Sequence, residues 1–152
     1  MSERRRLLGV DYGSVRVGLA VSDRDRKIAS PLATYARRSR DQDASFFRRL
    51  IEVEEIGGLV VGLPVHNDGR EGQKAREARA LGQWLKETTG LPVTFWDERF
   101  TTMEAEGYLL DAGLTNKRRK ERRDRVAAQI LLQTYLDAGC PPETAPGPLS
   151  GQ

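Results

Sequence analysis

The spacing of hydrophobic and polar positions in the first 36 residues predicts three strands. The apolar run over residues 7–10 is typical of a strand buried on both faces. Apolar and polar residues then alternate over residues 15–21, which predicts a second strand joined to the first by a hairpin. We expect Gly13 to supply a positive φ in the turn of this hairpin. Residues 28–35 predict a third strand, which Pro31 places at a sheet edge or at a bulge.

The rest of the chain alternates between helical periodicity and short apolar runs. The expected elements are a helix from residue 41 to the Gly57-Gly58 pair, a strand over 59–64, a helix over 73–90, a strand over 93–96, a short helix over 101–113 capped by Thr101 or Thr102, and a final helix that follows a basic stretch and has Asp124 at its start.

This order of elements indicates the fold class. Three antiparallel strands followed by strand–helix–strand units predict an α/β protein with a mixed five-stranded sheet and helices on both faces. The same order occurs in the ribonuclease-H-like fold. We expect a single domain over residues 1–139 and a disordered tail rich in Pro and Gly over residues 140–152.

The amino-acid composition excludes several kinds of catalytic and metal-binding site. The chain has one cysteine and one histidine, Cys140 and His66, so an internal disulfide, a multi-cysteine zinc site and His-rich catalysis are excluded. No apolar run approaches the roughly 20 residues that span a bilayer, and no signal-peptide pattern precedes the first strand. These features predict a cytoplasmic protein without a membrane partner.

The charge distribution predicts a polyanionic partner. The net charge is only +3, but basic residues gather just before Asp124. A solvated helix face is the alternative explanation. The candidate nucleic-acid-binding residues of this stretch are Lys117, Arg118, Arg119, Lys120, Arg122 and Arg123.

Acidic residues follow two of the predicted strands. Asp11 ends the first strand, and Asp97 and Glu98 end the fifth. Asp124 shares a helix face with apolar residues, which would direct its carboxylate toward the sheet. Taken singly, Asp11 could cap its own turn and Asp124 could interact with the helix dipole. Taken together, carboxylates at one sheet edge suit Mg²⁺ or Mn²⁺, which can activate water for phosphodiester hydrolysis.

Five neighbouring residues have alternative roles. Asp97 and Glu98 point to opposite faces if the strand continues, so only one should bind metal, and we favour Glu98. Glu71 is either an additional ligand or a helix cap. Arg16 and Arg99 either contact the scissile phosphate or form structural ion pairs.

Four sequence segments together resemble the signature motifs of one known family. The segments are GVDYGSVRVGLAVSD, VVGLP followed by DGREG, WDERFTT, and DRVAAQILLQTYLD, and they resemble the YqgF/RuvX proteins. The resemblance covers residues 7–138 and implies a ribonuclease-H-like, metal-dependent nuclease of the bacterial cytoplasm. By position it assigns the family's acidic residues to Asp11, Glu98 and Asp124. It also implies a role in processing the 5′ end of pre-16S ribosomal RNA.

Two other functions remain open at this point. One is a Holliday-junction resolvase acting in DNA recombination and repair, and the other is a non-catalytic nucleic-acid-binding module. We favour RNA as the partner over branched DNA, because junction cleavage needs two sites related by two-fold symmetry. The sequence shows no obvious dimer interface, so we expect a monomer or a weak homodimer.

Overall fold

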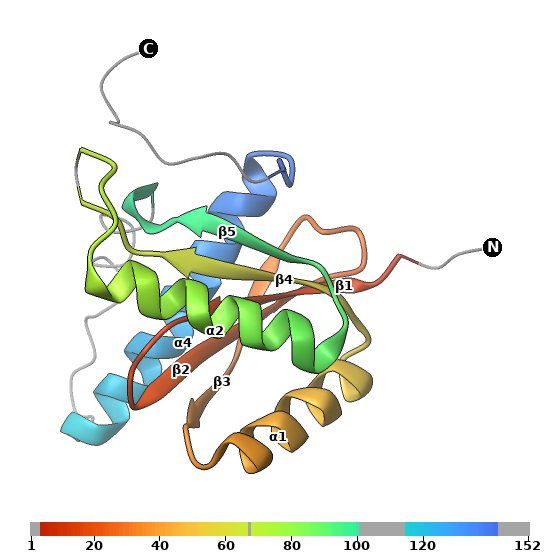
Figure 1. The fold of residues 1–152 in the computed structure, drawn as a ribbon. Helices are drawn as coiled ribbons and strands as arrows, with labels where there is room; N and C mark the ends of the chain where they lie inside the picture. Colours follow the sequence, from red (N-terminus) through yellow and green to blue (C-terminus); the bar gives the residue numbers. More distant parts are fainter. Residues whose placement is uncertain (1–3, 67, 101–114, 143–152) are drawn as a thin grey trace.

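Five strands form one mixed sheet in the computed structural model of this protein, which describes residues 4–66, 68–100 and 115–142 (Figure 1). The strand order is β3-β2-β1-β4-β5. Strand β1 pairs antiparallel with β2, and β2 pairs antiparallel with β3, whereas β1–β4 and β4–β5 are parallel pairs. The strands are β1 (Arg6–Asp11), β2 (Arg16–Ser22), β3 (Ala29–Ala36), β4 (Ile56–Leu63) and β5 (Val93–Asp97).

Helices cover both faces of this sheet (Figure 1). Helices α1 (Arg40–Val53) and α2 (Gln73–Thr89) lie on one face, and α4 (Asn116–Asp137) lies on the other. A short 3-10 turn, η1 (Glu98–Phe100), directly follows β5. The predicted α/β architecture is therefore confirmed. Within the described residues, no helix is both long and apolar enough to cross a bilayer.

Side chains of alternate residues in the central strands point to opposite faces of the sheet and pack into two separate hydrophobic cores. Leu8 and Val10 of β1 face α1 and α2, where they pack with Phe47 and Leu85. Leu7 of the same strand faces α4 in the second core. The other members of the second core include Ala20, Val60, Ala128, Leu132, Tyr135 and Leu136. A β-strand buried on both faces explains the unbroken apolar run that opens the chain.

The boundary between α1 and β4 differs from our prediction. Helix α1 ends at Val53, and Glu55 takes a positive φ of 55°. Strand β4 then begins at Ile56, which lies opposite Arg6 in the parallel pair with β1. Gly57 and Gly58 therefore belong to the strand, and the prediction that they end the helix was wrong. Pairing with β1 outweighs the weak strand preference of glycine.

The last helix starts earlier than predicted. Thr115 caps α4, because its side chain accepts a hydrogen bond from the backbone N–H of Arg118. The basic stretch forms the first turns of α4 instead of preceding it. Asp124 consequently lies more than two turns inside the helix, so the explanation through the helix dipole was wrong. The predicted helix over residues 101–113 and the tail from residue 143 lie outside the described residues.

Two predictions about the first three strands had different outcomes. The register of β2 and β3 shifts next to Pro31 in the edge strand β3, so both expectations for this proline are confirmed. The positive φ expected for Gly13 was wrong, since the described glycines with positive φ lie elsewhere. Gly13 is needed for space: a β-carbon there would lie 2.0 Å from the carbonyl oxygen of Arg16.

Candidate active site

Two carboxyl groups meet at the carboxyl end of the parallel strands. Asp11 is the last residue of β1, and Glu98 is the first residue after β5. Their side chains are hydrogen-bonded to each other, which requires one of the two carboxyl groups to carry a proton. Burial, followed by the negative charge of Asp11, raises the pKa of Glu98 well above its usual value. Burial also raises the pKa of Asp11, to which the charge of Asp124 contributes.

Gly62 makes the contact between Asp11 and Glu98 sterically feasible. Strand β4 lies between β1 and β5, so a side chain on β4 could fill the space between the two carboxyl groups. A β-carbon at residue 62 would lie 2.3 Å from Oε1 of Glu98. Glycine at this position therefore leaves room for the Glu98 side chain over the middle strand.

A second close approach brings Asp124 to the same place. Gly18 is the cross-strand partner of Asp11, and a β-carbon at residue 18 would lie 1.9 Å from the carbonyl oxygen of Asp124. Helix α4 thus rests directly on β2 beside Asp11. Nε of Arg16 donates a hydrogen bond to Oδ2 of Asp124 at 2.8 Å. The structure accordingly brings Asp11, Glu98 and Asp124 together, and it adds Arg16 as the partner of Asp124.

The carboxylates are held by protein partners in this arrangement. Asp11 and Glu98 are bonded to each other, and Asp124 is bonded to Arg16. In the described part of the chain, no group of three or more His, Cys, Asp or Glu side chains is arranged to hold a metal ion as it stands. The chemistry of the donors nevertheless suits a hard divalent cation, because carboxylate oxygens are its preferred ligands and a cation would offset both the burial and the mutual repulsion that raise these pKa values.

Asp97 and Arg99 form an ion pair beside this cluster. Nε of Arg99 lies 3.0 and 2.9 Å from the two carboxylate oxygens of Asp97, and both side chains are almost fully buried, at 7% and 11% exposed. Arg99 also donates to the backbone carbonyl of His66. The carboxylate of Asp97 is therefore bonded to Arg99 and takes no part in the hydrogen bond between Asp11 and Glu98. For Arg99, the structure shows the ion pair that we gave as the alternative to phosphate binding.

Glu71 has a third role that we did not predict. Both of its carboxylate oxygens accept hydrogen bonds from Arg79, at 2.6 and 2.7 Å. The N-cap of α2 is Gly72, which makes no side-chain capping bond, so the helix-cap explanation for Glu71 was wrong. Arg79 in turn lies over the ring of Phe95 in β5. Glu71 fixes the loop before α2 to the underlying sheet.

The basic residues before Asp124 form an exposed end of α4. All six candidates are exposed, as expected for groups that could meet a polyanion. Arg118 and Arg122 line a shallow hollow of about 400 Å³ with Arg125 and Glu121. These residues occupy the turns of α4 that precede Asp124 in the chain.

The sequence did not indicate one basic residue of this site, Lys74. Its charge acts on Glu98, and Lys74 lines a groove of about 300 Å³ that also includes Tyr12, Arg16, Glu77 and Asp124. Lys74 lies in the first turn of α2, directly after the loop that leaves β4. Such loops end at the same sheet edge as Asp11, and this topological signal could have identified the residue.

Comparisons with known proteins agree with this geometry. The sequence profile of the RuvX family, described as Holliday junction resolvase, matches residues 5–138. A protein of Rhodopirellula baltica named "Putative pre-16S rRNA nuclease" is 47% identical over 133 residues, which cover 88% of this chain and 77% of that protein. A protein of Ruegeria pomeroyi with the same name is 46% identical over 131 residues, covering 86% and 85% of the two chains.

Solved structures with low sequence identity share the fold. RuvC of Thermus thermophilus, determined in complex with a Holliday junction substrate, has a TM-score of 0.55 and 14% identity, covering 94% of this chain and 99% of that one. Fowlpox virus resolvase, determined with Holliday junction DNA, has a TM-score of 0.56 and 10% identity, covering 90% and 99%. The sheet order and the family match lead to one conclusion: this chain belongs to the RuvX family.

Proposed function

We propose that this protein is a divalent-metal-dependent nuclease that hydrolyses phosphodiester bonds, with precursor 16S ribosomal RNA as its substrate in the bacterial cytoplasm. The observation that carries the proposal is the contact between Asp11 and Glu98 with Asp124 alongside. Buried carboxyl groups that repel one another are costly to ionise, and a functional role accounts for their being kept together. Membership of the RuvX family and the names of the relatives support the same activity.

The proposed metal ligands are Asp11, Glu98 and Asp124, which would hold Mg²⁺ or Mn²⁺ through their oxygens. The bound cation supplies a nucleophilic water and stabilises charge on the phosphate. For Glu98 to serve as a ligand it must lose the proton that it shares with Asp11. Asp97 and Glu71 are poor additional ligands, because Arg99 and Arg79 already occupy their carboxylates.

Positive groups around the cluster would position the substrate. Arg16 and Lys74 line the groove beside Asp124, where a phosphate could lie between them. As a phosphate approaches, Arg16 can exchange its bond with Asp124 for a charge-assisted bond to the phosphate, which frees the Asp124 carboxylate. The exposed basic end of α4 would hold the backbone further along the strand.

A second candidate function is the resolution of four-way DNA junctions. The description of the RuvX family favours it, whereas the names of the curated relatives favour ribosomal RNA. Symmetric cleavage of a junction needs two copies of the site in a two-fold dimer. RNA processing has no such requirement, and we therefore place it first.

One cleavage experiment tests both candidates. Purified protein is incubated with labelled precursor rRNA, single-stranded RNA and a four-way DNA junction, with Mg²⁺, with Mn²⁺ or with a chelator. We expect metal-dependent cleavage of the precursor near its 5′ end, and loss of that cleavage in Glu98→Gln. Glu87→Gln is the matched control, because Glu87 is an exposed residue of α2. Cleavage of the junction alone would favour resolution, and undiminished cleavage by folded Glu98→Gln would refute the mechanism.

A further inference from the structure

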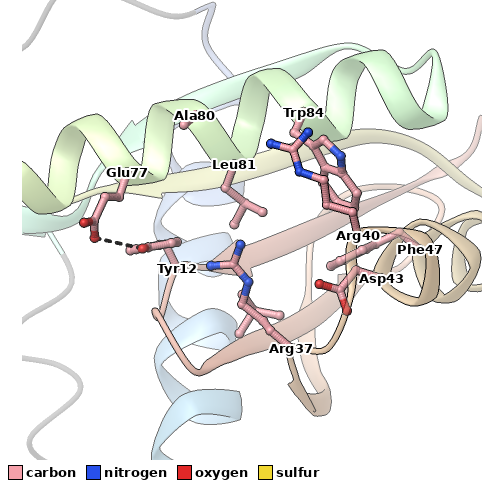
Figure 2. A pocket seen from close by; sticks show the side chains of 10 residues that line it. Tyr12, Arg37, Arg40, Asp43, Phe47, Glu77, Ala80, Leu81 and Trp84 are labelled. Atoms are coloured by element: carbon pink, nitrogen blue, oxygen red, sulfur yellow. Dashed lines mark hydrogen bonds between the residues drawn. The ribbon is translucent and has the colours of Figure 1, made fainter.

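A pocket of about 280 Å³ lies on the face of the sheet opposite α4 (Figure 2). It is formed where α1, α2 and the end of β1 meet, and the proposed catalytic cluster does not use it. The residues that matter for its chemistry are Tyr12, Arg37, Arg40, Asp43, Glu77 and Trp84. Ligand pockets are typically about 300–1,000 Å³, so this one suits a single small ring system.

The walls combine aromatic rings with guanidinium groups. Trp84 is half-buried, and its ring packs against the ring of Phe47 in a T-shaped arrangement, with 6.2 Å between the ring centres. Arg37 lies over the ring of Tyr12 at 5.7 Å, and Arg40 is exposed at the start of α1. Aromatic faces and planar guanidinium groups are the surfaces on which nucleobases stack.

Two carboxylates in the same walls balance the charges of Arg37 and Arg40, so the pocket has no excess positive charge to favour a phosphate as the occupant. Asp43 is only 7% exposed, and its Oδ1 accepts hydrogen bonds from the hydroxyl of Tyr35 and from a backbone N–H. Glu77 contributes a second negative charge. These groups repel an anion, but they can accept hydrogen bonds from the amino groups of a neutral base.

The position of the pocket links it to the carboxylate cluster. Successive residues of a strand point to opposite faces, so Asp11 faces α4 while Tyr12 faces the pocket. The hydroxyl of Tyr12 donates to Glu77 at 2.8 Å (Figure 2). Tyr12 and Glu77 also line the groove that holds Arg16, Lys74 and Asp124, so the groove and the pocket share one wall.

We propose that this pocket receives one unpaired nucleobase of the strand that is cut, with a preference for bases that carry an exocyclic amino group. The proposal rests on the proposed nuclease function. A strand whose phosphate lies at Asp11 and Asp124 continues through the groove past Lys74, and a neighbouring base reaches the pocket and stacks on Trp84. A fully paired duplex cannot supply this base without unpairing and unstacking it.

Fluorescence of Trp84 gives a direct test in the full chain. The only other tryptophan, Trp96, lies on the α4 side against Tyr135, so Trp96→Phe leaves Trp84 as the sole indole. A short single-stranded oligoadenylate is titrated into this variant without divalent metal. We expect quenching of Trp84 emission that tracks binding measured by anisotropy of the labelled strand, whereas oligouridylate should quench it less.

A second measurement uses the unaltered protein. A strand with an abasic site keeps every phosphate but lacks the base, and we expect the best-placed abasic site to weaken binding by roughly 5- to 150-fold, the loss for one base–aromatic stack. Equal affinity at every abasic position, with unchanged Trp84 emission on binding, would overturn the pocket while leaving the nuclease function intact. If none of the strands binds, both the pocket proposal and the proposed nuclease function are overturned.

Discussion

The backbone of Asp124 in α4 lies directly against Gly18 in β2, with no room for a side chain between them. We therefore expect Gly18→Ala to displace α4 and to separate Asp124 from Asp11. Overpacking of this kind costs about 1–3 kcal/mol of unfolding free energy, and a clash with backbone should fall at the upper end of that range.

Gly58→Ala is the control for this prediction. A β-carbon at residue 58 would meet a methyl group of Leu7 at 3.1 Å, and a side chain can yield where backbone cannot. Urea unfolding of both variants measures the difference in free energy. A loss at residue 18 no larger than the loss at residue 58 would mean that α4 is not held as closely as described.

Removing one charge from the cluster should stabilise the metal-free protein. Asp11→Asn keeps the side-chain shape but removes the cost of burying a charge and the repulsion between Asp11 and Asp124. We expect a higher melting temperature in chelator and a loss of cleavage of more than about 100-fold, since even outer-shell partners of a metal are worth 10- to 100-fold. If Asp11 only capped its turn, Asn would replace it and cleavage would persist.

Divalent metal should stabilise the unaltered protein selectively. A ligand that binds only the folded state raises the melting temperature as its concentration increases. We expect Mn²⁺ to raise the melting temperature of the unaltered protein and to leave that of Asp11→Asn nearly unchanged. Thermal scans across a metal series measure this effect, and an equal rise in both proteins would place the metal elsewhere.

The raised pKa of Glu98 predicts a pH dependence of stability. Folded Glu98 keeps a proton that the unfolded chain releases above its usual pKa of 4.5. The free energy of unfolding in chelator should therefore decrease as the pH rises from this value toward the folded pKa. Glu98→Gln carries no such proton, so its curve should be flatter. Parallel curves for the two proteins, obtained by denaturant titration at several pH values, would contradict the raised pKa.

The exposed basic end of α4 should control the salt dependence of binding. Replacing Lys117, Arg118, Arg119 and Lys120 by Ala should lower the slope of log affinity against log salt by about 0.7–0.9 for each phosphate that these side chains neutralise. Stability should change little, because these side chains are exposed. The double variant Arg49→Ala/Lys86→Ala is the control, because it removes exposed positive charges from α1 and α2, which lie on the other face of the sheet from α4. An unchanged slope would assign the stretch to a solvated surface.

The strands were predictable because burial on both faces or on one face leaves a clear pattern in the sequence. The errors occurred where a local signal competed with pairing or packing. Gly57 and Gly58 have the sequence signature of a helix end, but the parallel pairing of β4 with β1 includes them in a strand. Lys and Arg are good helix formers, so the basic stretch continues α4 back to Thr115 without any break.

The proximity of Asp11, Glu98 and Asp124 was predictable because strand ends and helix faces fix where these residues can lie. Their partners were not, since ion pairs such as Arg16 with Asp124 and Arg79 with Glu71 join segments far apart in the sequence. The choice between Asp97 and Glu98 depended on the turn η1, which begins at Glu98 and ends the alternation of the strand. Periodicity alone cannot show where a strand stops.

The packing of α4 against the sheet also has a consequence for synthesis on the ribosome. Asp124 lies in α4, the helix that covers the second core. The carboxylate of Asp124 therefore reaches the site only when α4 packs on the sheet and completes this core. A nascent chain that has emerged as far as β5 already carries Asp11 and Glu98 but lacks Asp124. On the proposed mechanism, such a chain lacks one of the three carboxylates, and nuclease activity begins only after α4 docks.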